Sequence, residues 1–232
     1  MSKTGDSKTE IAKHHISLYR KYRPENFKEV VGQEHIVSVL EKSIEQGTLA
    51  HAYAFCGSRG TGKTSIARIF AKAIGTSSND LYEIDAASNT SVDDIRALTE
   101  AVSTVPLESK YKVYILDEVH MLSKAAFNAF LKTLEEPPKH VIFILATTEV
   151  EKLPETIVSR CEVYTFKKPT VETLKQVVTR IAKKEGSEIE PEAAELIALL
   201  GDGSFRDTLG ALQKALSSVG EGKPLALKEV ED

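Results

Sequence analysis

The sequence predicts an α/β fold, a parallel sheet flanked by helices, followed by a small all-helical unit. A glycine-rich loop, GSRGTGKT at residues 57–64, follows an apolar run, and strand-like and helix-like segments alternate up to residue 166. Beyond residue 168 the pattern is helical only. Alternation of this kind is typical of parallel sheets covered by helices. We therefore expect a flexible tail at residues 1–17, a phosphate-loop core at 18–167 and a helical lid at 168–232.

The elements are predicted from apolar spacing and helix-breaking residues. An amphipathic helix follows residue 33, and Pro137 and Pro138 end a later helix. The run VIFILA at 141–146 is typical of a strand buried on both faces. Strands are predicted at residues 53–56, 81–85, 113–117 and 141–146. Helices are predicted at residues 65–73, 92–101, 125–134, 174–184, 191–200 and 205–216.

Composition narrows the classes of function. The chain has 232 residues and a net charge of −4, so any contact with nucleic acid must be local rather than a bulk attraction. There is no run of eighteen apolar residues and the N-terminus does not read as a signal peptide. Two cysteines, Cys56 and Cys161, do not make a disulfide framework. These features predict a cytoplasmic protein.

The loop at residues 57–64 matches the phosphate-loop pattern of a glycine, four residues and Gly-Lys-Thr. Glycines let the backbone N–H groups turn inward around a polyphosphate, and the following helix directs its positive end at the same group. In this pattern Lys63 reaches the β- and γ-phosphates and Thr64 ligates magnesium. A plain turn before a helix is the alternative, but strand, loop and helix occur in the required order. The candidate nucleotide ligands are Gly57, Ser58, Arg59, Gly60, Thr61, Gly62, Lys63, Thr64 and Ser65.

Two carboxylates end the strand predicted at residues 113–117. Asp117 is expected to hold magnesium together with Thr64, and Glu118 to orient and deprotonate an attacking water. A kinase must exclude that water and has little use for the second carboxylate. A solvated acidic turn is the alternative, and it fits poorly beside a phosphate loop. The two motifs together predict ATP and Mg²⁺ as cofactors and hydrolysis as the reaction.

Further motifs occur in the order found in one known family. They are KYRP at 21–24, VGQEH at 31–35, EIDAAS at 83–88, DEVHMLS at 117–123, LKTLEEPP at 131–138, SRC at 159–161 and GSFRD at 203–207. With the phosphate loop, they resemble the AAA+ ATPases of the clamp-loader clade. Within the clade the similarity is greatest to the gamma/tau subunits of bacterial DNA polymerase III. It extends from residue 18 to about 215 and implies a five-stranded parallel sheet.

The resemblance implies roles for three distant side chains. Thr148 would act as a sensor between the γ-phosphate and the sheet, and Arg206 would reach the phosphates from the lid. Arg160 would be an arginine finger supplied in trans to the ATP of a neighbouring subunit. Taken singly, Arg206 also reads as a surface residue, and Arg160 as the partner of a local carboxylate such as Glu162.

The resemblance also implies an adenine pocket and a DNA-facing surface. Tyr19, Arg23, Pro24 and Val31 would line the pocket, with ordinary packing as the alternative. Two helix starts would face template phosphates, with Lys132 a few residues beyond the second. For these residues, ordinary helix capping is an equally good interpretation; they are Asn89, Thr90, Ser91, Lys124 and Lys132.

Two departures from the family pattern stand out. Gamma/tau subunits usually carry a four-cysteine zinc-binding insertion before the EIDAAS strand, and residues 74–80 contain no cysteine. A closed zinc site needs about four ligands, so we expect no structural zinc. The sequence also ends after the lid, where the family continues into a helical collar. Weak assembly is therefore expected for residues 1–232 alone.

Three functions are compatible with these patterns. The first is a motor subunit that couples ATP to opening a sliding clamp and placing it on primed DNA, within the DNA polymerase III holoenzyme, a nucleotidyltransferase. Its partners would be other clamp-loader subunits in a pentamer, the clamp, and primer–template DNA through its phosphates, without a membrane. The second is a remodelling or branch-migration motor, which the segments at 18–24 and 159–161 disfavour. The third is a non-hydrolysing interaction subunit, which the intact phosphate loop and carboxylates disfavour.

Overall fold

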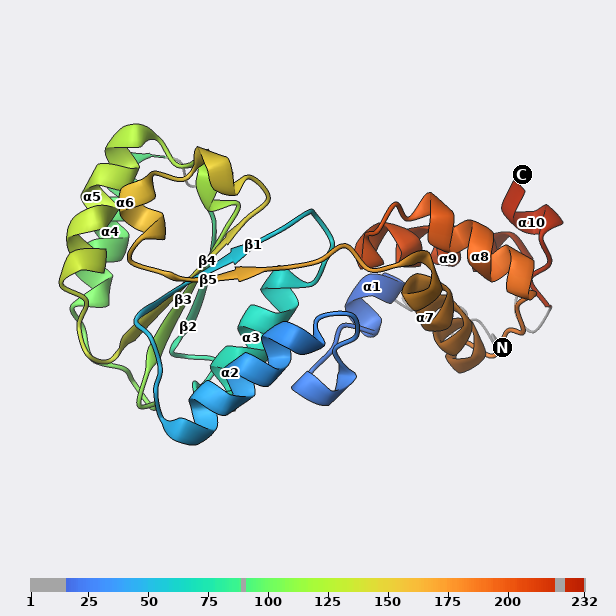
Figure 1. The fold of residues 1–232 in the computed structure, drawn as a ribbon, viewed down its shortest axis with the longest axis horizontal. Helices are drawn as coiled ribbons and strands as arrows, with labels where there is room; N and C mark the ends of the chain where they lie inside the picture. Colours follow the sequence, from blue (N-terminus) through green and yellow to red (C-terminus); the bar gives the residue numbers. More distant parts are fainter. Residues whose placement is uncertain (1–15, 89–90, 220–223, 232) are drawn as a thin grey trace, which may run out of the picture.

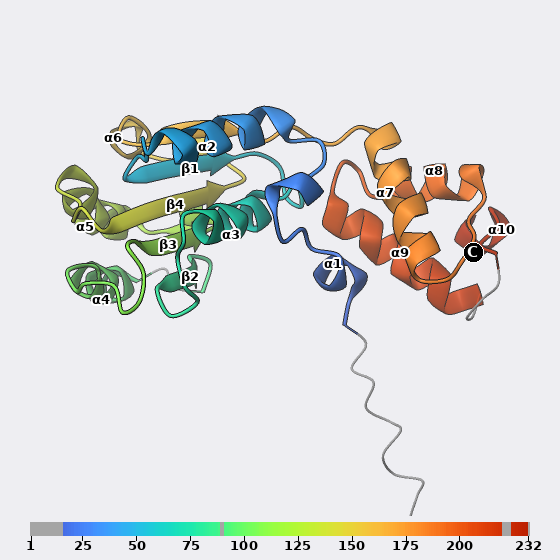
Figure 2. The same cartoon turned by 90° about the horizontal axis from the view of Figure 1, so that it is seen from below.

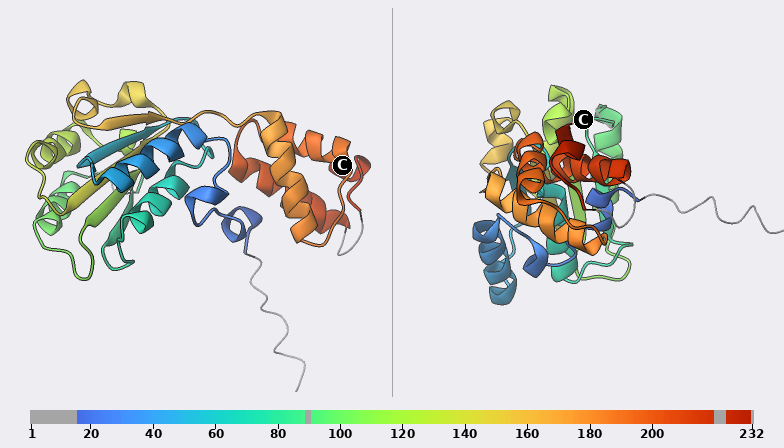
Figure 3. Two further views of the ribbon diagram at one scale, coloured as in Figure 1. Left: turned by 60° about the horizontal axis from the view of Figure 1, so that its bottom comes forward. Right: turned by 90° about the vertical axis from the view of Figure 1, so that its right-hand side faces the viewer.

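The computed structural model describes residues 16–88, 91–219 and 224–231. A sheet with helices on both faces forms one part of the molecule, and a group of helices lies at one end of it (Figure 1). The segment after the last strand leads from the sheet to the helical group, as Figure 3 shows from two further directions. Nearly all of the tail predicted at residues 1–17 lies outside the described residues. None of the helices within the described residues is long and apolar enough to cross a membrane.

The sheet has five parallel strands in the order β2-β3-β4-β1-β5. The predicted fold class, a five-stranded parallel sheet flanked by helices and followed by a helical unit, is confirmed. The central strands are buried along their whole length, as continuous apolar runs predict. The strands are β1 (Ala52–Cys56), β2 (Leu81–Asp85), β3 (Lys112–Asp117), β4 (Val141–Thr147) and β5 (Glu162–Thr165).

Helices cover both faces of the sheet (Figure 2). Phe70 and Ile36 belong to the apolar cluster on one face, and Phe130 and Ile95 to the cluster on the other. The first face carries α2 (Glu34–Gln46) and α3 (Lys63–Ala73). The second carries α4 (Val92–Val102), α5 (Lys124–Glu135) and α6 (Glu155–Val158). Short 3-10 turns lie at η1 (Phe27–Glu29), η2 (Val119–Met121) and η3 (Val150–Lys152).

The C-terminal helices form a third apolar cluster, and we call them the lid. They are α7 (Val171–Lys184), α8 (Pro191–Leu200), α9 (Phe205–Val219) and α10 (Lys228–Glu231). The first helix that the structure describes, α1 (Leu18–Lys21), packs on the lid. Its Leu18 N–H donates to Oε1 of Gln213 at 3.0 Å, and Lys21 pairs with Glu185 at 2.7 Å. Segments from both ends of the sequence therefore meet in the lid. The division at residue 167 stays a proposal.

Candidate active site

The phosphate loop connects the end of β1 to the start of α3. Gly60 has a φ of +74°, and a Cβ atom there would lie 1.9 Å from Oγ of Ser204 on the lid. Gly57 has a φ of +151°, and its Cβ would lie 2.7 Å from the carbonyl oxygen of Phe166. Glycine is therefore required at both positions by backbone conformation and by close approach. The loop is packed directly between the sheet and the lid.

Lys63 begins α3 and is 6% exposed. Its Nζ donates to the carbonyl oxygens of Gly57 at 2.6 Å and of Ser58 at 2.8 Å, which holds the ammonium over the loop. Burial lowers the pKa of Lys63, while the nearby charges of Glu118 and Asp117 oppose that shift. An ammonium in this position faces the space where a polyphosphate bound by the loop would lie.

Asp117, at the end of β3, meets the first turn of α3. The Thr64 hydroxyl donates to Oδ2 of Asp117 at 2.8 Å, and the N–H of Glu118 donates to Oδ1 of Asp117 at 3.0 Å. A hydroxyl beside a carboxylate is a donor set that Mg²⁺ accepts, because this ion typically takes few protein oxygens and keeps several waters. Thr64 and Asp117 therefore fit the magnesium role that the sequence predicts for them.

Glu118 follows in a left-handed conformation, with φ +49° and ψ +41°. It lines the same cavity as Lys63 and Asp117. The hydroxyl of Thr148, which follows β4, donates to Oε2 of Glu118 at 3.2 Å. The ends of β3 and β4 are neighbours in the sheet, so parallel strand order brings these two side chains together. Thr148 thus contacts the predicted general base directly.

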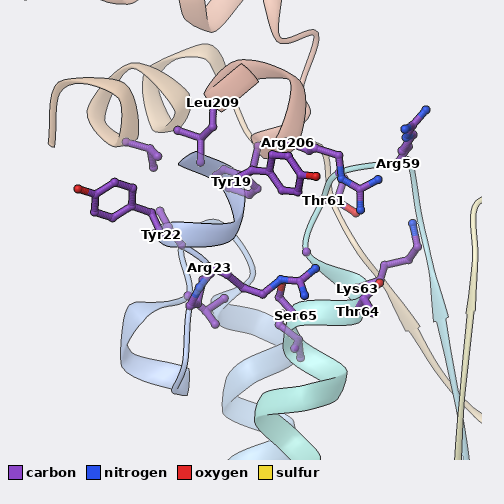
Figure 4. Close-up of a pocket in the computed structure, with 18 of the residues that line it drawn as sticks. Tyr19, Tyr22, Arg23, Arg59, Thr61, Lys63, Thr64, Ser65, Arg206 and Leu209 are labelled. Atoms are coloured by element: carbon purple, nitrogen blue, oxygen red, sulfur yellow. The ribbon is translucent and has the colours of Figure 1, made fainter. Parts of the chain in front are cut away.

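A cavity of about 460 Å³ extends from the loop to the lid and α1. Figure 4 shows Arg23, from the segment that follows α1, and Arg206, from α9, directed toward the phosphate loop, with the Tyr19 ring near Arg206. The Arg206 guanidinium carbon lies 5.7 Å from the centre of that ring. Burial, and then the neighbouring charge of Arg68, lower the pKa of Arg23. Two cationic groups therefore face a cavity with aromatic and aliphatic walls, as a nucleotide requires.

The structure brings most of the predicted nucleotide ligands together. Those that line the cavity are Tyr19, Arg23, Pro24, Val31, Arg59, Gly60, Thr61, Gly62, Lys63, Thr64, Ser65, Asp117, Glu118 and Arg206. Gly57 and Ser58 contribute through their carbonyl groups, which accept from Lys63. Arg59 points away from the other labelled side chains (Figure 4).

Arg160 does not line the cavity. It follows α6 and pairs with Oε1 of Glu135 on α5 at 2.7 Å, while its other guanidinium nitrogen donates to the carbonyl of Thr156 at 2.6 Å. The local carboxylate that it contacts is Glu135, and not Glu162. This placement, at one third exposure of the side chain, leaves Arg160 on the surface, and its role in trans remains a proposal.

Of the predicted DNA-facing residues, Ser91 and Lys124 lie at helix starts, and Lys132 lies in the last turn of α5. Ser91 caps α4 and forms a capping box with Asp94, which is the ordinary structural role of such a residue. Lys124 and Lys132 are exposed on α5. Asn89 and Thr90 lie outside the described residues. DNA contact at these positions stays a prediction.

Several residues of the cavity were not predicted. They are Tyr22, Glu29, Val30, Ile66, Asp85, Val177, Arg180, Ile181, Phe205 and Leu209. Phe205 and Leu209 stand one turn apart in the helix that carries Arg206, so helical spacing around that arginine was the available signal. Val177, Arg180 and Ile181 belong to α7, whose position beside the cavity is a matter of tertiary packing.

A structural metal site was expected to be absent. Among the residues that the structure describes, no group of three or more His, Cys, Asp or Glu side chains is arranged to hold a metal ion. Cys56 and Cys161 are both free. The expectation of no structural zinc remains a prediction.

Sequence comparison relates the chain to characterised bacterial proteins. It is 47% identical over 226 residues to the DNA polymerase III subunit tau of Bacillus subtilis, covering 88% of this chain and 40% of that protein. It is 45% identical over 227 residues to subunit tau of Escherichia coli, covering 89% and 35%. The chain is a homologue of the DNA polymerase III gamma/tau subunits. It spans less than two thirds of the length of these relatives.

The remaining comparisons agree with this relationship. Residues 76–170 match the family described as DNA polymerase III, delta subunit. Among solved structures, the Holliday junction branch migration motor RuvB of Thermotoga maritima superposes with a TM-score of 0.74 at 26% identity, covering 90% of this chain and 71% of that one. A point mutant of the same RuvB gives the same TM-score at 24% identity, covering 91% and 71%. The gamma/tau homologue therefore has the fold of an AAA+ ATPase.

Proposed function

We propose that this gamma/tau homologue is an ATP-binding and ATP-hydrolysing motor subunit of a DNA polymerase clamp loader. It would couple ATP to opening a sliding clamp and placing it on primed DNA. The observation that supports this best is the continuous set of contacts from Thr64 through Asp117 to Glu118 and Thr148 beside a buried Lys63. A site that only bound nucleotide would need the lysine and the loop but not the ordered second carboxylate.

Nucleotide binding would use both parts of the molecule. The loop N–H groups and Lys63 would hold the phosphates, and Thr64 with Asp117 would hold Mg²⁺, which neutralises phosphate charge when bound. Arg206 would add a charge-assisted contact from the lid, and the walls near Tyr19 and Arg23 would receive the base. Closure of the lid over the nucleotide would exclude bulk water.

Hydrolysis would depend on Glu118. Its carboxylate would accept a proton from the attacking water, and Thr148 would hold the Oε2 oxygen so that the other oxygen faces that water. In-line attack on the γ-phosphate then releases phosphate, and the negative charge on the phosphate oxygens is stabilised by Lys63. Glu118 is the group whose removal would stop turnover without removing a phosphate contact.

Full activity would require assembly. Arg160 would act on the ATP of a neighbouring subunit, where a guanidinium beside the γ-phosphate raises the rate by roughly 10³–10⁵. The neighbours would be other clamp-loader subunits in a cytoplasmic pentamer. The exposed starts of α4 and α5 would meet the phosphates of primer–template DNA.

The test is the rate of ATP hydrolysis per subunit against protein concentration, with and without primed DNA and a sliding clamp. We expect slow hydrolysis by the dilute chain and a rate per subunit that rises with assembly. Lys63→Ala should abolish nucleotide binding, and Glu118→Gln should preserve binding but stop turnover. Fast hydrolysis that does not depend on protein concentration would contradict a site completed by Arg160 of a neighbouring subunit. A hexamer with strand-displacement activity would support the branch-migration alternative, and binding without hydrolysis in the assembly would support an interaction subunit.

A further inference from the structure

His120 is a buried histidine that lies between two carboxylates. Its side chain is 6% exposed. Nδ1 lies 3.0 Å from Oγ1 of Thr147 and 3.5 Å from Oε2 of Glu118, and Nε2 lies 3.1 Å from Oε1 of Glu149. Both ring nitrogens are therefore engaged, and the ring cannot turn without losing a contact on one side. Burial of a polar ring with three oxygen neighbours fixes its orientation.

The backbone at Glu118 is the second observation. Its left-handed conformation, with φ +49°, is one that non-glycine residues rarely adopt. The Met121 N–H donates to the Glu118 carbonyl at 2.9 Å, which closes a turn that contains His120. Strained conformations persist where the surroundings determine them and are frequent at functional sites. The anchored ring of His120 is one of the groups that hold this turn.

The anchors of His120 are themselves fixed. Thr147 is fully buried at the end of β4, and its hydroxyl accepts the N–H of Glu149 at 3.0 Å. Oε2 of Glu149 lies 2.6 Å from Nζ of Lys152. The hydrogen bond from Lys152, and then the charges of Lys152 and His120, lower the pKa of Glu149 against the opposing effect of burial. Glu149 therefore presents an ionised acceptor to Nε2.

We propose that His120 is a positioning residue for Glu118, with Thr147 and Glu149 as its anchors. Nδ1 lies 3.5 Å from Oε2 of Glu118, the oxygen that accepts a hydrogen bond from Thr148. With Oε2 bonded to Thr148 and in contact with the His120 ring, Oε1 is assigned to the attacking water. This inference rests on the proposed function, because only a hydrolytic site uses Glu118 as a base.

Three substitutions of His120 distinguish the contribution of Nδ1 from that of Nε2. The side-chain nitrogen of asparagine can occupy the place of Nδ1, whereas that of glutamine reaches toward the place of Nε2. We expect His120→Ala and His120→Gln to lower kcat about 10–100-fold, since a misplacement of about 1 Å costs a factor of that order. His120→Asn should restore most of kcat. The Kd for ATP should stay near that of the wild-type chain in all three. Because a buried, bonded ring is lost in each, the melting temperature should fall, and by a similar amount in His120→Gln and His120→Asn.

The measurements are ATP hydrolysis under single-turnover conditions, binding of ATPγS, and binding of ADP with aluminium fluoride as a transition-state analogue. We expect His120→Ala to weaken the analogue and leave ATPγS binding within about twofold, because only transition-state contacts change kcat. His140→Asn is the matched control. Its ring contacts the carbonyls of Val102 and Thr104, outside the cavity. The substitution should therefore alter neither the rate of hydrolysis nor the binding of the transition-state analogue.

Two results would overturn the positioning role. One is a parallel loss of ATPγS binding, thermal stability and kcat in His120→Ala, which would indicate a structural role. The other is equal rates for His120→Gln and His120→Asn. The variant Glu118→Gln distinguishes failure of the proposed hydrolytic function from failure of the positioning role. If that variant hydrolyses ATP as fast as wild type, there is no base to position.

Discussion

The backbone N–H of Phe205 donates to the carbonyl oxygen of Gly60 at 2.9 Å, so the first turn of α9 is bonded to the phosphate loop. Ser204 fills the space where a Cβ of Gly60 would lie. Arg206 is the next residue of the same turn. A displacement of the loop on binding phosphate would therefore move the lid and its arginine together.

Gly60→Ala tests this connection. The new methyl group would meet Ser204 at 1.9 Å in addition to the strained φ of +74°, so we expect the lid to leave the loop. The Kd for ATP should rise at least about tenfold, equivalent to roughly 1.4 kcal/mol. Titration with a fluorescent ATP analogue measures the Kd, and thermal denaturation measures the loss of contact between lid and loop.

Gly75→Ala is the matched control for backbone strain. Its φ is +81° but a Cβ there meets nothing within 4 Å, and the residue follows α3 at the end remote from the loop. It should lower stability by about 1 kcal/mol and leave ATP affinity unchanged. Equal effects of the two substitutions on ATP affinity would contradict the connection between loop and lid.

Arg160→Ala tests action in trans. The ion pair with Glu135 is solvent-exposed, so its loss should cost no more than about 1 kcal/mol of stability. The Kd of the isolated chain for ATP should change less than about twofold, while assembly-dependent hydrolysis should fall about 10³-fold. A fall in the ATP affinity of the isolated chain would refute the trans assignment.

Mixing two inactive variants gives a positive control for that experiment. Glu118→Gln keeps the arginine but loses the base, and Arg160→Ala keeps the base but loses the arginine. If the site is shared, a mixture in the assembled loader should hydrolyse ATP at a substantial fraction of the wild-type rate. No recovery in a mixture that assembles normally would show that the arginine acts in its own subunit.

Local sequence was sufficient for most of the fold. The apolar run at 141–146 predicted a strand buried on both faces, and β4 is buried from Val141 to Thr147. The phosphate loop was predictable because its glycines and the helix that follows are contiguous. β5 was not located, because the sequence EVYT lies at a sheet edge, is largely exposed and carries little apolar signal.

Contacts between residues far apart in the sequence could not be predicted from local sequence patterns. The neighbours of His120 lie at the end of β4 and just after it, and only the order of β3 and β4 in the sheet brings them to β3. Arg160 contacts Glu135, 25 residues away, although Glu162 is nearer in sequence. The α7 wall of the cavity depends on how the lid packs. Sequence spacing predicted which residues carry chemistry but not which neighbours orient them.

Arg206→Ala should weaken nucleotide binding. A hydrogen bond from a charged group contributes about 1.5–3 kcal/mol, so the Kd for ATP should rise roughly 10–100-fold. The loss should be smaller for adenosine, which lacks the phosphates that Arg206 would contact. Arg96→Ala is the control, since that side chain is 67% exposed on α4 and does not line the cavity, so its removal should change the Kd little. Equal losses of affinity for ATP and for adenosine would indicate that Arg206 contacts the adenine base and not the phosphates.

Asp80 provides a prediction on pH. The carboxylate is fully buried and accepts the N–H groups of Leu107, Glu108 and Ser109 at 2.6, 2.9 and 2.8 Å. Burial alone would raise the pKa of Asp80, but these donors hold it far below the ordinary value of 3.8. With the folded pKa below the unfolded one, its stabilising effect is present above about pH 4 and is lost as the pH falls.

Asp80→Asn should therefore lower the urea midpoint of unfolding at pH 7, because the neutral amide is a weaker acceptor for three donors. The difference from wild type should shrink between about pH 4 and pH 2, as the wild-type carboxylate is protonated. Asp93→Asn is the control. Its side chain is 88% exposed and pairs with Arg96 on the same helix, so the midpoint should change little at any pH. A difference for Asp80→Asn that stayed constant down to pH 2 would mean that the ionised carboxylate is not what holds residues 107–109.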